Sequence, residues 1–165
     1  MKAITLWQPW ASLLACGAKQ YETRSWATNY RGPIAIHAAI TRKYYCTAGY
    51  QDIMIEAAHD KRWQEYLMQC ADTEEHEIPF GAVIATAELV ECHRIQKDPK
   101  THRFCGYGND GRVTKLPIFL PKNEYLFGDW TPGRFAWEFA NMKILVRPVP
   151  AKGKQGLWEW EESAE

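Results

Sequence analysis

The chain has 165 residues with 20 basic and 20 acidic side chains, so its formal net charge at pH 7 is zero. This length fits one domain that buries its own core, and we expect a single domain over residues 1–165. Zero net charge argues against a protein that coats duplex nucleic acid by bulk charge, but it leaves a local basic cleft open.

The first elements alternate between strand and helix. Lys2–Trp7 predicts a strand, and an apolar helical run begins at Pro9 and stops at Gly17, which suits the residue after a helix. Tyr21–Trp26 predicts a second strand, and Ile34–Ala38 a third after a Gly-Pro turn.

Residues 41–76 have helical spacing, which predicts one long helix or two broken ones. The clearest strand starts at Gly81, and the polar, glycine-containing segment 96–112 predicts a loop. A last strand begins at Phe135 and continues to Arg147, and we expect Pro148 and Pro150 to end it. Strands, loops and one helical unit together indicate an α+β domain with a small curved sheet or barrel.

A cluster of alternating charges follows the first helix. Side chains alternate along a strand, so Gln20, Glu22 and Arg24 share one face, and Lys19 at the preceding turn can reach the same cleft. Such a cluster can bind a phosphate, a base edge or a reacting carbonyl. The alternative is an edge strand with a surface ion pair, worth about 0–1 kcal/mol.

Several short motifs occur in order over nearly the whole chain. They are Trp7-Gln8-Pro9-Trp10-Ala11, Gly17-x-Lys19-x-x-Glu22-x-Arg24, Arg31-Gly32-Pro33, Gly81-Ala82-Val83-Ile84, Gly133-Arg134-Phe135-Ala136-Trp137 and Gly153-Lys154-Gln155-Gly156-Leu157-Trp158. This ordered set resembles the ASCH domain, the activating-signal-cointegrator homology domain.

The resemblance implies a PUA-like β-barrel with flanking helices, with residues 41–76 as a helical insertion. It also implies a cleft lined by Lys19, Glu22 and Arg24 that holds RNA, other single-stranded nucleic acid, or a modified base or nucleotide. Some members of this family bind nucleic acid, and others hydrolyse acylated cytidine or RNA. The resemblance therefore leaves two alternatives, a binding module and a hydrolase in which Lys19, Glu22 and Arg24 are catalytic.

One position departs from the hydrolytic branch that acts on acylated cytidine. That branch resembles Lys-x-x-Thr-x-Arg, with the Thr as nucleophile, and Glu22 stands at the Thr position here. A carboxylate can act as a general base but cannot form the ordinary acyl-enzyme ester. Thr23 is adjacent but lies on the opposite face of a regular strand.

Aromatic residues near this cluster are candidates for stacking on a base. Trp10, Tyr21 and Trp26 are expected to bind nucleic acid together with Lys19, Glu22 and Arg24. Trp7 is a further pocket candidate, whereas Trp137 in an alternating strand is expected in the core. The basic segment 96–122 is either a nucleic-acid-binding loop or a solvated one.

No motif indicates a cofactor or a metal. His102-x-x-Cys105 has no paired Cys-x-x-Cys beside it, and Gly106-x-Gly108 does not join a strand to a helix as a dinucleotide fingerprint does. We expect a cytoplasmic protein with reduced thiols and no membrane segment. A third hypothesis, an adaptor, would place a protein partner on the helical unit 41–76.

Overall fold

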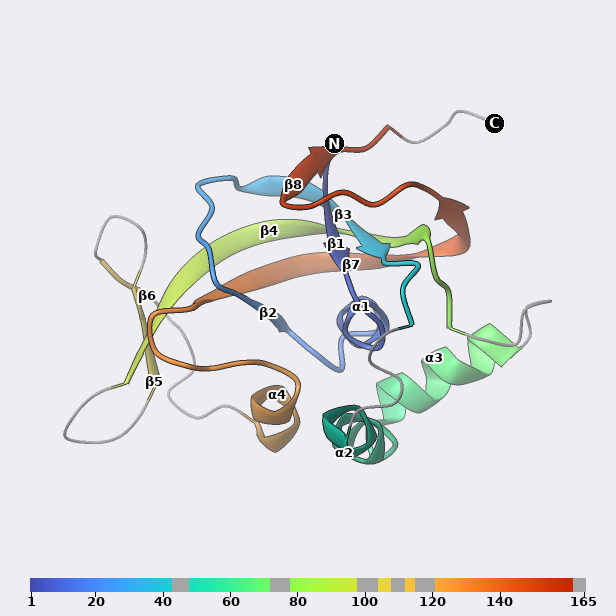
Figure 1. Ribbon diagram of the computed structural model, residues 1–165, viewed down its shortest axis with the longest axis horizontal. Helices are drawn as coiled ribbons and strands as arrows, with labels where there is room; N and C mark the ends of the chain where they lie inside the picture. Colours follow the sequence, from blue (N-terminus) through green and yellow to red (C-terminus); the bar gives the residue numbers. More distant parts are fainter. Residues whose placement is uncertain (43–47, 72–77, 98–103, 108–111, 115–120, 162–165) are drawn as a thin grey trace.

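The computed structural model describes residues 1–42, 48–71, 78–97, 104–107, 112–114 and 121–161, and its architecture is mixed α+β (Figure 1). Within these residues, eight strands form one sheet. Its main path runs through β2 (Tyr21–Arg24), β7 (Phe135–Pro150), β4 (Ala82–Lys97), β3 (Gly32–Ala38), β1 (Lys2–Leu6) and β8 (Leu157–Glu159). β5 (Phe104–Tyr107) pairs with the far end of β4 and with β6 (Val113–Thr114).

The sheet is curved but not closed. β2 and β8 are the two ends of the path, and no ladder joins them within the described residues. The closed barrel that we expected is therefore not observed, although the α+β class is confirmed. Register shifts in the ladders of β4 with β3 and β7 bend the long strands, as bulges do.

Helix α1 (Trp10–Ala15) lies at the centre of the packing. Residues 11–15 are all buried. Leu14 contacts the sheet side of the core, with Ile4 and Trp137, while Leu13 belongs to a second apolar cluster on the other side. The helix ends as the sequence predicts, since Gly17 has a φ of +77°, a conformation that favours glycine.

Two helices, α2 (Ala48–Ala57) and α3 (Lys61–Ala71), form the described part of the helical unit, so of the two alternatives, one long helix or two broken ones, the second is observed. They lie away from the sheet, beyond α1, with the short helix α4 (Lys122–Leu126) beside α2 (Figure 1). Trp63 and Tyr66 of α3 bury their rings in the second cluster. Their status as an insertion, and as a partner surface, stays a prediction. None of the described helices has the length and apolarity that crossing a membrane requires.

The longest difference from the sequence prediction is in β7. We expected the strand to reach Arg147 and to be ended by Pro148 and Pro150, but β7 includes both prolines and ends at Pro150. β2 covers β7 only along Phe135–Glu138, so among the described strands the rest of β7 has a ladder on the β4 side alone. Proline is tolerated in such a strand where its missing N–H faces the unpaired side.

Some shorter elements were also not predicted as such. β5 lies in the segment that we expected to be a loop, and the sequence analysis did not expect β6, α4 or β8, the last of which pairs with residues 2–4 of β1. β2 is two residues shorter than predicted, ending at Arg24. Each of these segments is too short to show a period in the sequence.

We predict that the helical unit contributes to global stability through Trp63, which is 1% exposed. Trp63→Ala should lower the free energy of unfolding by about 3–5 kcal/mol, because the cavity cannot refill. Met68→Ala on the same helix is the control: Met68 is 70% exposed, and its loss should be about 0.5 kcal/mol or less. Urea denaturation monitored by circular dichroism measures both, and equal effects would contradict the prediction.

Candidate functional site

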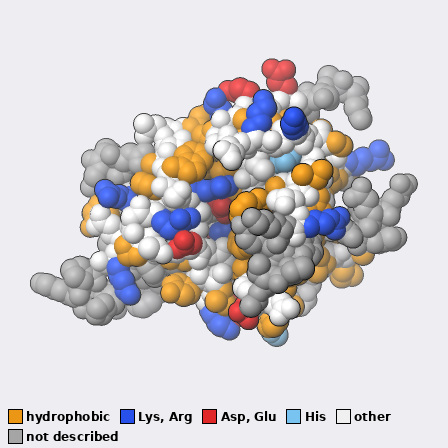
Figure 2. Space-filling view, viewed as in Figure 1, with side chains coloured by type: hydrophobic (Ala, Val, Ile, Leu, Met, Phe, Trp, Pro, Cys, Tyr) orange, Lys and Arg blue, Asp and Glu red, His pale blue; other side chains and the backbone are white. Residues whose placement is uncertain are grey.

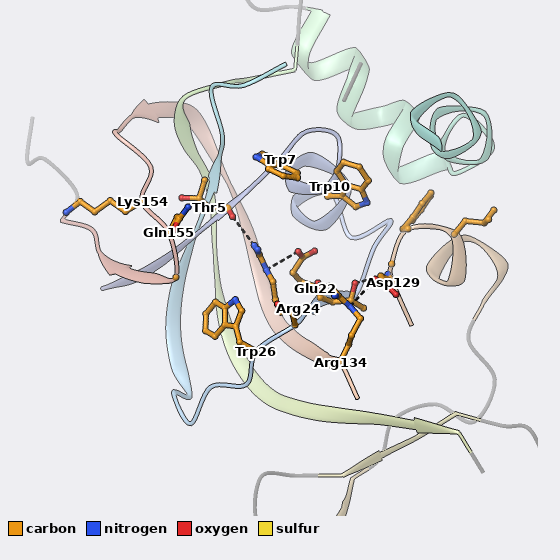
Figure 3. Close-up of a pocket in the computed structure, with 16 residues that line it drawn as sticks. Thr5, Trp7, Trp10, Glu22, Arg24, Trp26, Asp129, Arg134, Lys154 and Gln155 are labelled. Carbon is orange, nitrogen blue, oxygen red and sulfur yellow. Dashed lines mark hydrogen bonds and ion pairs between the residues drawn. The ribbon is translucent and has the colours of Figure 1, made fainter. Parts of the chain in front are cut away.

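A cleft of about 900 Å³ opens where the C-terminal end of β1, the start of α1 and strand β2 meet. The turn after α4 and the loop before β8 form its two other walls. Figure 2 shows basic and acidic side chains together near the centre of this face, with hydrophobic side chains around them. The close-up in Figure 3 shows Arg24 in the middle of the site.

Glu22 and Arg24 form the charged floor of the cleft, and they come from the same face of β2 as predicted. Arg24 Nε lies 3.2 Å from Glu22 Oε1. Arg24 Nη2 donates a hydrogen bond to the Thr5 carbonyl at 2.9 Å, across the gap between β2 and β1. The Arg24 side chain keeps 25% of its surface exposed and the Glu22 side chain 12%, so both reach the cleft.

Lys19 lies beneath this floor and is 1% exposed. Its ammonium donates to the Tyr21 carbonyl and lies 3.6 Å from Glu22 Oε2. The wall of the cleft does not include it. Lys19 therefore acts on Glu22 from behind, and removing one partner of such a buried pair would leave the other charge uncompensated.

Glu124 of α4 fixes the start of β2 from the same buried layer. Its two carboxylate oxygens accept hydrogen bonds from the backbone N–H groups of Gln20 and Tyr21 at 2.8 and 3.0 Å. Burial raises the pKa of Glu124, while nearby Lys19 and these N–H groups oppose the rise. The carboxyl group thus determines where the strand that carries Glu22 and Arg24 begins.

Three tryptophans surround the charged floor (Figure 3). Trp7 follows β1 and is 45% exposed, and Trp10 opens α1. Trp26 follows β2 and packs edge-on against Trp137, with ring centroids 4.6 Å apart. Trp137 itself is fully buried, as predicted, and donates from Nε1 to the Trp26 carbonyl at 3.4 Å. Trp26 is therefore held in place from below while its other side lines the cleft.

The two walls of the cleft hold residues to which we assigned no role. Lys154 and Gln155 lie on one wall. Asp129 and Arg134 lie on the other, with Arg134 Nε 3.2 Å from Asp129 Oδ2. Lys154 and Arg134 belong to two of the motifs that carry the family resemblance. Only the folded chain shows that these motifs meet at the cleft.

Each wall depends on a glycine at a close approach. A Cβ at Gly153 would lie 2.5 Å from His37 Cε1, and one at Gly128 would lie 2.8 Å from Trp130 Nε1. Both neighbours are rings of buried residues, which cannot move away easily. The backbone of each wall therefore rests directly on the core.

The structure brings together four of the six residues expected to bind nucleic acid, namely Trp10, Glu22, Arg24 and Trp26. Tyr21 points to the opposite face of β2, where its ring packs against His93 and Trp130. Burial, followed by Glu138 and Glu124, raises the pKa of Tyr21 to about 12. Neither Tyr21 nor Lys19 lines the cleft.

The remaining candidates fall partly outside the described residues. His102 and three of the basic residues of segment 96–122, namely Lys100, Arg103 and Lys115, are among those not described. Within the described ranges, no three His, Cys, Asp or Glu side chains are grouped so that they could hold a metal ion. Cys16, Cys70 and Cys92 form no disulfide there.

Comparison with known proteins identifies one family. Residues 4–115, more than half of the chain, match the family described as the ASCH domain. The matched region contains the floor of the cleft and all three surrounding tryptophans. No curated protein sequence matches the chain significantly.

We predict that Glu124→Gln destabilises the protein by about 1–3 kcal/mol, because the amide NH₂ would face a backbone N–H and leave it unsatisfied. Glu65→Gln on α3 is the matched control, since the Glu65 side chain is 57% exposed. Chemical denaturation at neutral pH measures both. Equal stability of the two variants would show that the carboxylate of Glu124 does not hold β2.

His37, beneath the Lys154 wall, predicts a loss of stability in acid. Burial lowers the pKa of His37 in the folded protein, although its bond to the Ala151 carbonyl opposes this. The unfolded chain binds the proton first, so this contribution is complete above about pH 6.5 and is lost as the pH falls below it. Urea denaturation at about pH 7.5 and about pH 5 measures how far the free energy of unfolding falls between the two pH values. This fall should be smaller for His37→Gln than for the wild type. Exposed His59→Gln should behave as the wild type does.

Proposed function

The chain belongs to the ASCH domain family, and from this membership and the cleft we propose that the protein binds a nucleotide or single-stranded nucleic acid, with RNA as the expected polymer. The observation that carries the proposal is the Glu22–Arg24 pair, partly exposed on a floor surrounded by three tryptophans. Charged hydrogen-bonding groups and aromatic rings in one cleft match the two faces of a nucleobase, its polar edge and its π surface.

The tryptophans supply the part of the affinity that does not depend on sequence. A base stacked on an aromatic side chain contributes about 1–3 kcal/mol. Trp7 and Trp10 stand on one side of Arg24 and Trp26 on another (Figure 3). A base that enters between these rings reaches the charged floor with its edge.

The walls supply contacts for phosphate. Lys154 is exposed on one wall, and Arg134 lines the other while it pairs with Asp129. With no excess of positive charge over the chain, only such local groups attract phosphates. We therefore expect few phosphate contacts and a shallow dependence on salt, about 0.7 in log–log slope per contact with a single strand.

Hydrolysis in the same cleft is the alternative, with Glu22 as the general base. Thr23, which we expected on the opposite face, also lines the cleft. Its hydroxyl oxygen already accepts a hydrogen bond from the Asp129 N–H at 2.8 Å, which disfavours acyl transfer through Thr23. Lys19, the base that would activate such a nucleophile, is committed to the Tyr21 carbonyl and Glu22. RNA cleavage that Glu22→Gln abolishes would favour the hydrolase.

We predict that Trp7→Ala weakens the binding of a short single-stranded RNA by about 1–3 kcal/mol, because one stacking surface is lost. The fold should persist, since Trp7 is 45% exposed. Tyr125→Ala is the control, because Tyr125 is an aromatic residue of α4 that is 55% exposed and does not line the cleft. Fluorescence anisotropy of a labelled oligonucleotide measures both. Absence of any RNA or nucleotide binding by the wild type at low salt would refute the proposed function.

A further inference from the structure

The floor of the cleft offers a defined set of hydrogen-bonding groups, because its inner groups are either bonded within the protein or buried away from a ligand. Arg24 gives Nη2 to the Thr5 carbonyl, and its Nε is buried beside Glu22. Nη1 has no hydrogen-bond partner in the part of the chain that the structure describes. Since the side chain is 25% exposed and lines the cleft, the guanidinium has N–H groups left to donate to a ligand, the two of Nη1 among them.

Glu22 presents acceptors next to this donor. Its Oε1 lies 3.2 Å from Arg24 Nε and its Oε2 lies 3.6 Å from Lys19 Nζ. An ionised carboxylate accepts only, and its two oxygens have about four lone-pair sites between them. Both oxygens therefore keep acceptor capacity after these contacts, and the floor presents guanidinium N–H donors beside two acceptor oxygens.

We propose that the base recognised here is guanine, held by its Watson–Crick edge; this inference rests on the proposed function. Guanine presents the complementary series, with O6 as acceptor and N1–H and N2–H₂ as donors. O6 would accept from Arg24, and the two donors would bind the Glu22 carboxylate. Two parallel hydrogen bonds to an ionised group are among the stronger polar contacts.

The other bases place acceptors where the carboxylate stands. Adenine would bring N1, cytosine N3 and O2, and uracil O2 against an oxygen of Glu22. Each such contact leaves two acceptors facing one another without a proton, and a desolvated site rejects ligands that leave its polar groups unpaired. A purine also covers more of the surrounding tryptophans than a pyrimidine does.

The first experiment compares GMP, IMP, AMP, CMP and UMP on the wild-type protein by isothermal titration calorimetry at low salt. GMP should bind about tenfold or more tightly than AMP, CMP and UMP. IMP lacks only the N2 amine, so its affinity should lie between those of GMP and AMP. Equal affinities, or preference for another base, would overturn the assignment of guanine but leave nucleotide binding intact. If none of the nucleotides and no short RNA binds, the proposed function itself fails.

The second experiment changes the acceptor pair. Glu22→Gln replaces one carboxylate oxygen by a donor, so the preference for GMP over AMP should fall about tenfold or more. Glu65→Gln, exposed on α3, should leave the preference unchanged. An unchanged preference in Glu22→Gln would show that Glu22 is not the residue that selects guanine. Should this variant fail to fold because Lys19 loses its partner, the wild-type nucleotide series decides alone.

Discussion

The hydrogen bond from Arg24 to the Thr5 carbonyl spans the opening in the sheet. β8 covers β1 only along Lys2–Ile4, so Thr5 lies at an edge with no ladder from another described strand, and among the described strands β2 pairs with β7 alone. A guanidinium group stands where a backbone ladder would otherwise close the sheet. The Arg24 side chain separates β2 from the end of β1, and the cleft lies in this gap. Arg24 is also part of the charged floor that the tryptophans surround.

The floor is supported by a buried layer of charge. Lys19 pairs with Glu22, its charge also acts on Glu124, and Glu124 holds the backbone at the start of β2. Burying these groups costs free energy that an apolar layer would not cost. What the layer provides is position: the strand, its glutamate and its arginine are fixed by hydrogen bonds and ion pairs with definite geometry.

Local pattern was sufficient for the parts of the site that lie on one strand. Alternation placed Glu22 and Arg24 on one face, and Gly17 fixed the end of α1. Alternation says nothing of Lys19, because a turn residue can direct its side chain inward, as Lys19 does toward the Tyr21 carbonyl. The walls were not predictable, since Asp129 and Lys154 are more than a hundred residues from β2 in the sequence and reach the cleft only through the tertiary fold. The open edge at Thr5 was equally hidden, because it depends on where β8 stops.

The two glycines at the walls have a consequence for how a ligand enters. Gly153 lies against His37 of β3, and Gly128 lies against Trp130, so neither wall has a layer of side chains on which it could slide. A loop that closes over a ligand needs room to move against the residues beneath it. The cleft is therefore preorganised: its shape is set when the protein folds, and a bound molecule loses little affinity to ordering the chain around it. We therefore expect a ligand to bind to a preformed site, without closure of a loop over it.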